Sequence, residues 1–122
     1  MVCVEDWAEP RTLTLAEGAT AAIRELNHLT RGPAAFTGPA ELYRLVAELA
    51  LLAGGLPQLV DQLDRWLQGE LGAGRVRSDD RADPGPAVRG AAVDLAEAGA
   101  AAHDLTRVLA GAQQRLARLG GA

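Results

Sequence analysis

A run of apolar side chains between residues 39 and 71 constrains the fold most, because its spacing alternates strictly between three and four residues. Its members are Leu42, Leu45, Leu49, Leu52, Leu56, Leu59, Leu63 and Trp66. This spacing is that of one face of an α-helix, and a β-strand with its period of two does not produce it. The run passes Pro57 without losing register, so it predicts one kinked helix over residues 39–71 rather than two separate helices.

Two further helices follow from the same kind of pattern. The stripe of residues 87–119 is rich in Ala at its start and in Leu at its end: Val88, Ala91, Leu95, Ala98, Ala102, Leu105, Leu109, Ala112, Leu116 and Leu119. A capping pattern from Thr14 to Glu17, followed by apolar residues at helical spacing, predicts a shorter helix over residues 14–31.

The remaining segments predict no regular structure. Residues 1–13 show no helical period and are interpreted as an extended arm. Residues 72–86 are rich in Gly, Pro and charged residues and predict a flexible linker. Such a linker most simply joins the two long helices as an antiparallel hairpin.

Composition supports an all-α fold. Aromatic residues make up 3% of the chain, and β-branched residues are scarce, so the side chains that a sheet needs are missing. With 122 residues, a single domain (1–122) is expected.

The predicted architecture is the antiparallel long-helix hairpin plus the shorter N-terminal helix, which covers the first half of residues 39–71. That half carries a second apolar seam, formed by Tyr43, Ala47, Ala50 and Gly54.

Charge and composition exclude several classes of function. All 12 basic residues are Arg, a bias typical of GC-rich, actinobacterial-type coding sequences, and a chain without Lys cannot form a Schiff base or supply a P-loop lysine. A net charge of −4 disfavours nucleic-acid binding. The single Cys, the lack of a signal-peptide pattern and the short apolar run of residues 49–56 lead us to expect a cytoplasmic protein without a membrane segment.

No constellation for catalysis or metal binding is apparent. His28 and His103 are the only histidines, and neither has a His or Cys three or four residues away on its helix. Cys3 and Ser78 lie in segments without regular structure, where no rigid base supports a nucleophile. We therefore expect no catalytic residue, no cofactor and no metal ligand, and interpret the histidines as ordinary boundary residues.

The linker holds the only local basic cluster, which consists of Arg75, Arg77 and Arg81. Three nearby Asp residues neutralise it, and no aromatic residue is interleaved for base stacking. A solvated loop is the favoured interpretation, with docking to an acidic partner as the alternative.

The second half of residues 39–71 carries more apolar surface than the Ala-rich start of residues 87–119 can cover. The predicted interface residues are Leu56, Leu59, Val60, Leu63, Trp66 and Leu67. They predict a non-enzymatic interaction or oligomerisation protein, an accessory subunit of a cytoplasmic complex, with a homodimer or another helical protein as its partner. Two alternatives stay open: residues 1–13 cover this surface, or the chain is a small dimeric helical DNA-associated regulator.

Overall fold

The computed structural model describes residues 9–121, and within them the chain is all-helical. In chain order the elements are α1 (Arg11–Leu29), a short 3-10 helix η2 (Pro33–Ala35), α2 (Pro39–Gly72) and α3 (Gly85–Leu116). These elements fall into two compact units, divided between Thr37 and Gly38. Each unit is considered by itself. The single-domain assignment stays a prediction.

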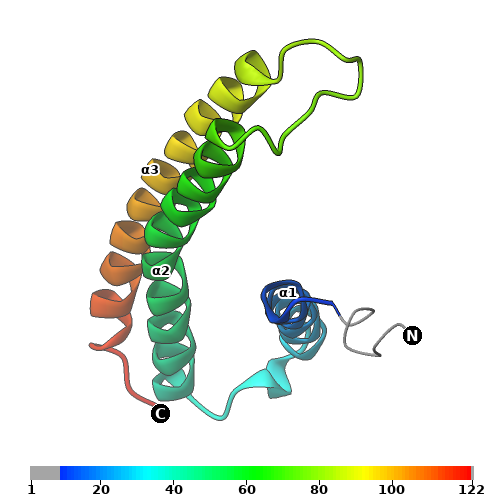
Figure 1. The fold of residues 1–122 in the computed structure, drawn as a ribbon. Coiled ribbons are helices and arrows are strands. Elements are labelled where there is room, and N and C mark those ends of the chain that lie inside the picture. Colours follow the sequence, from blue (N-terminus) through cyan, green and yellow to red (C-terminus); the bar gives the residue numbers. More distant parts are fainter. Residues whose placement is uncertain (1–8, 122) are drawn as a thin grey trace. The chain divides into compact units, whose positions relative to one another are not determined.

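The second unit is the predicted antiparallel hairpin (Figure 1). In it α2 and α3 pack against each other along their length and curve together. The helix α2 continues without interruption through Pro57, so the prediction of one helix across the Gly54–Pro57 segment is confirmed.

The first unit consists of α1 and η2. The helix begins at Arg11, so the prediction of a start at Thr14 is wrong. The carbonyl of Pro10 accepts hydrogen bonds from the amides of Leu13 and Thr14, at 3.0 and 3.3 Å, and closes the first turn before the predicted cap is reached. Residues 11–13 of the predicted arm are therefore helical. Residues 1–8 of that arm lie outside the described residues.

At its other end α1 stops at Leu29 rather than at residue 31. The Thr30 hydroxyl and amide both donate to the Leu26 carbonyl, at 2.7 and 2.9 Å, and end the helix there. Within its own unit α1 buries none of its residues. Its predicted role as the cover of the first half of α2 stays a prediction.

The helix α3 is displaced by two to three residues from its predicted range of 87–119. It begins at Gly85, whose amide donates to Asp83 Oδ1 at 3.0 Å, and Pro86 lies in the first turn, where its missing N–H costs nothing. At the end, the amide of Leu119 bonds to the carbonyl of Leu116 at 3.0 Å in a tighter turn. The linker between the long helices is correspondingly shorter, covering residues 73–84.

Small residues form the seam of the hairpin. Ala53, Val88 and Ala102 are 1%, 4% and 7% exposed and are its most deeply buried apolar residues. Small side chains let two helix backbones approach closely, so the helices pack well without a large apolar core. The most deeply buried line of the seam therefore runs beside the leucine stripe of α2, whose members are half-buried or exposed.

Contacts across the seam fix which residues face each other. Near the open end, Gln113 Nε2 donates a hydrogen bond to the Tyr43 hydroxyl at 3.2 Å. In the middle, Gly54 lies beside Thr106, whose Cγ2 is 3.7 Å from where a Cβ of Gly54 would be. The predicted second seam of α2, to which Tyr43 and Gly54 belong, thus faces α3.

Candidate interaction surface

One side of α2 leaves large apolar side chains outside the seam. Successive residues of a helix are turned by about 100°, so Leu52 points well away from its buried neighbour Ala53 and is 50% exposed. Leu59, Leu63 and Trp66 follow Leu52 after about two, three and four turns and lie on the same side. They are 48%, 51% and 66% exposed.

The helix α3 adds to the same side of the hairpin. In an antiparallel pair of helices, two residues face each other across the seam. The residues that stand the same number of positions after them along each helix lie on the same side of the pair. Leu105 follows the buried Ala102 by three residues, which turns it about 60° from Ala102 toward the side on which Leu52 lies, and Leu105 is 48% exposed. We call Leu52, Leu59, Leu63, Trp66 and Leu105 the leucine face.

The other side of the hairpin is mixed in character. Thr106 lies there beside Gly54, and its hydroxyl donates to the Ala102 carbonyl at 2.8 Å. A shallow groove on this side is lined by Asp61 and Asp64 together with apolar residues such as Leu95, and Asp61 forms an ion pair with Arg65 at 2.9 Å. The leucine face therefore differs from this side in having no charged member.

The six predicted interface residues divide between this face and the seam. Leu59, Leu63 and Trp66 lie on the leucine face. Leu56, Val60 and Leu67 are half-buried, and Val60 Cγ2 packs against Gly99. Whether the six bind a partner stays a prediction.

Leu52 and Leu105 belong to the leucine face but not to the predicted interface. The sequence marks both residues as apolar positions at helical spacing, since each belongs to one of the two predicted apolar stripes. Those stripes did not show that the seam would leave these two side chains on the outside.

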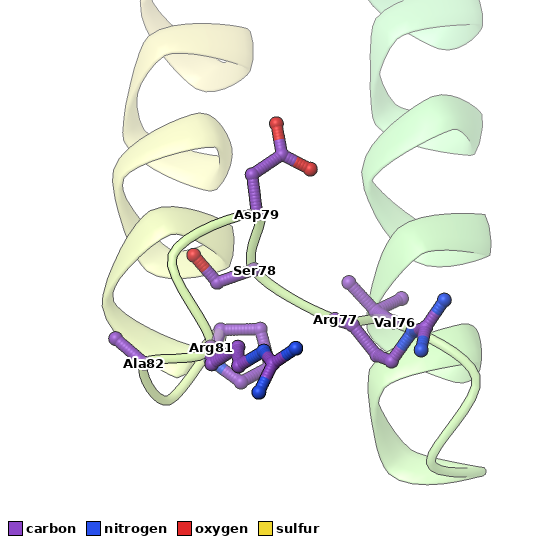
Figure 2. A pocket seen from close by; sticks show the side chains of 7 residues that line it. Val76, Arg77, Ser78, Asp79, Arg81 and Ala82 are labelled. Atoms are coloured by element: carbon purple, nitrogen blue, oxygen red, sulfur yellow. The ribbon is translucent and has the colours of Figure 1, made fainter.

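The loop between the long helices has a hollow (Figure 2). Ser78 and the exposed Arg77 and Arg81 are among its lining residues. The Ser78 hydroxyl donates to Asp80 Oδ1 at 2.5 Å, and the Ala82 amide donates to the same oxygen at 3.0 Å. These bonds lower the pKa of Asp80. They form a local turn on the exposed loop, in which the Asp80 carboxylate holds the Ser78 hydroxyl and the Ala82 amide.

Arg75, the third cation of the basic cluster, is bound at the end of α2. Its Nε and Nη2 donate to the two carboxylate oxygens of Glu70, at 2.6 and 3.0 Å, which raises the pKa of Arg75. A bidentate pair of this kind leaves less of the guanidinium for a ligand. The basic cluster is therefore reduced to Arg77 and Arg81, with Asp79 between them in the sequence.

The two histidines belong to different units. His28 and His103 are both exposed and lie on α1 and α3. Within residues 9–121, no group of three or more His, Cys, Asp or Glu side chains is placed to hold a metal ion. Cys3 lies outside the described residues.

Comparison of the chain with protein-family models, with curated proteins and with solved structures finds no match. No helix within residues 9–121 is long and apolar enough to cross a membrane. The leucine face is consequently the feature from which a function is argued.

Proposed function

We propose that this chain is a non-enzymatic helical interaction protein that binds a helical surface of another subunit through its leucine face. The observation that carries the proposal is the placement of five large apolar side chains, each 48–66% exposed, on one side of the hairpin. Contiguous apolar surface of this kind typically marks a site of protein–protein contact.

The energetic argument is one of burial. Complete burial of a Leu side chain contributes about 1.5–3 kcal/mol, and these side chains are about half exposed, so each gains roughly 1 kcal/mol on docking. The leucine face as a whole offers roughly 5 kcal/mol before the cost of association. This gain favours a partner that covers the whole face rather than one or two of its residues.

A helix is the partner structure that fits best. The α2 members of the face follow one another at spacings of seven, four and three residues, which keeps them on one side of the helix and presents ridges that interdigitate with those of another helix. A role as an accessory subunit of a helical complex follows from this geometry. The DNA-associated alternative gains no support from the described surface, where Arg75 of the only basic cluster is paired with Glu70.

Site-specific photo-crosslinking in the native host tests the proposal. A photoreactive residue placed at Leu63 should give a discrete protein adduct, because Leu63 would lie in the interface. The matched control is Leu51, which is 71% exposed but turned about 100° away from Leu52. Adducts from Leu51 as abundant as those from Leu63, or none from either, would contradict the proposal.

A further inference from the structure

We infer that the leucine face binds the same face of a second copy of this chain, with the loop ends of the two hairpins at opposite ends of a four-helix arrangement. The inference rests on the proposed function and names the partner of that surface. It is argued from three observations: the symmetry of the apolar stripe, the position of two charges on α3, and the size of the face.

The apolar stripe of α2 is self-complementary. Its spacings from Leu42 to Trp66 are 3, 4, 3, 4, 3, 4 and 3, which read the same from either end, with the centre at Gly54. A second copy of α2 running in the opposite direction about this centre places an apolar residue against each apolar residue. Leu52 then lies level with Leu56 of the second copy, and Leu49 with Leu59 of the second copy. Each exposed α2 member of the face thus meets a half-buried member of the same stripe.

Two charges on α3 have the same centre of symmetry. Glu97 and Arg115 are 18 residues apart, which is about five turns, so they lie on one line of the helix. Both are exposed, and neither makes an ion pair within the described part of the single chain. The residue midway between them is Thr106.

These two centres lie at the same level of the hairpin, because a Cβ placed on Gly54 would be 3.7 Å from Thr106 Cγ2 across the seam. One two-fold axis at this level therefore satisfies both the leucine pattern and the charge pattern. The axis lies in the plane of the face and runs perpendicular to both helices. It brings each Leu layer onto a Leu layer and each Glu97 level with Arg115 of the second copy. Closed two-fold pairing is also the commonest symmetry of soluble oligomers.

The opposite alignment, with both loop ends together, does not use the charges. It packs α3 of one copy against α2 of the other, so Glu97 and Arg115 of the two copies lie at opposite edges of the assembly and form no pairs. The charge pattern thus selects the arrangement with the loop ends apart.

The area is sufficient for a stable dimer. The whole stripe from Leu42 to Trp66, which extends the leucine face by the half-buried Leu42, Leu45 and Leu49, is about 36 Å long. Two packed helices are about 20 Å wide, which gives a footprint of roughly 700 Å² on each copy. The pair buries roughly 1,400 Å², within the range of about 1,200–2,000 Å² for specific complexes. A single docked helix, about 10 Å wide, covers only about half of this width.

Sedimentation equilibrium of the full chain tests the inference. The intact protein should be a dimer at tens of micromolar. Leu63→Arg should weaken dimerisation by roughly 100-fold or more, because it buries a charge at two symmetric places. Leu51→Arg, the matched control outside the face, should change Kd less than about threefold.

A charge exchange tests the alignment without altering apolar packing. Glu97→Arg and Arg115→Glu should each weaken the dimer by about threefold to tenfold, since each acts at two symmetric exposed sites, and the double exchange should restore it. A double exchange that fails to restore association would overturn the alignment. A monomeric intact chain would overturn the dimer, whereas an adduct from Leu63 to a different protein would leave the proposed function standing.

Discussion

Gly99 of α3 lies so close to Val60 of α2 that a Cβ added to Gly99 would be 3.3 Å from Val60 Cγ2 and 3.7 Å from the Pro57 Cα. The spacing of the two helices at this level thus depends on the absence of a side chain at residue 99. We expect Gly99→Leu to lower the free energy of unfolding by about 2 kcal/mol, because overpacking forces the helices apart. Chemical denaturation monitored by circular dichroism measures the change.

The control for this prediction lies on the same helix. A Cβ added to Gly90 meets nothing within 4 Å, so Gly90→Ala should raise the free energy of unfolding by about 0.5–1 kcal/mol through helix propensity alone. Equal effects of the two substitutions would show that the seam does not pass over Gly99.

Pro57 gives a second prediction. It lies inside the continuous helix α2, where it removes one backbone hydrogen bond. We expect Pro57→Ala to preserve the fold and to raise helicity and thermal stability, by about 1–3 kcal/mol at most. Loss of folding in circular dichroism would mean that Pro57 is required for a turn, contrary to the continuous helix.

The loop of residues 73–84 should be the first part of the hairpin to be cleaved by trypsin. Arg77 and Arg81 are exposed and lie outside regular secondary structure, whereas Arg89 and Arg107 lie within α3. Proteases cleave locally unfolded segments first. Mass spectrometry of early fragments should show cuts after Arg77 or Arg81 before any cut after Arg107, and the reverse order would be inconsistent with the hairpin.

The turn around Asp80 should depend on pH. The pKa of Asp80 is lowered first by the Ser78 hydroxyl and then by the Ala82 amide, since both donate to the ionised carboxylate. The stabilisation of this turn is therefore present above the ordinary Asp pKa and is lost as the pH falls through the lowered value. In a carboxyl-carbon NMR titration, Ser78→Ala should raise the pKa of Asp80, and an unchanged value would argue against this hydrogen bond.

The sequence predicts the hairpin but not its seam, and the reason is physical. Helical periodicity marks an apolar side of α2 that includes Leu52, Leu56 and the small residue Ala53. It does not show which of these faces the neighbouring helix, because both the leucine stripe and the small-residue line are apolar. Close packing of small residues decided the choice and left Leu52 half exposed.

Helix ends were the less predictable part of the fold. The Thr14 pattern was a sound capping signal, but the Pro10 carbonyl closes a turn earlier through backbone hydrogen bonds that have no side-chain signature. The Asp83 carboxylate likewise begins α3 at Gly85. Such local bonds shift the ends of helices without changing their faces, so the leucine face could be sought from sequence even though its exact members could not.

Quenching of Trp66 fluorescence tests the central claim, that the leucine face is an occupied interface, most directly. Trp66 is 66% exposed on the single hairpin, and a Trp7→Phe protein reports on it alone. Association should shield Trp66 from acrylamide at tens of micromolar, dilution should expose it, and Leu63→Arg should expose it at both concentrations. A Trp66 that is quenched equally in all of these samples would contradict the account.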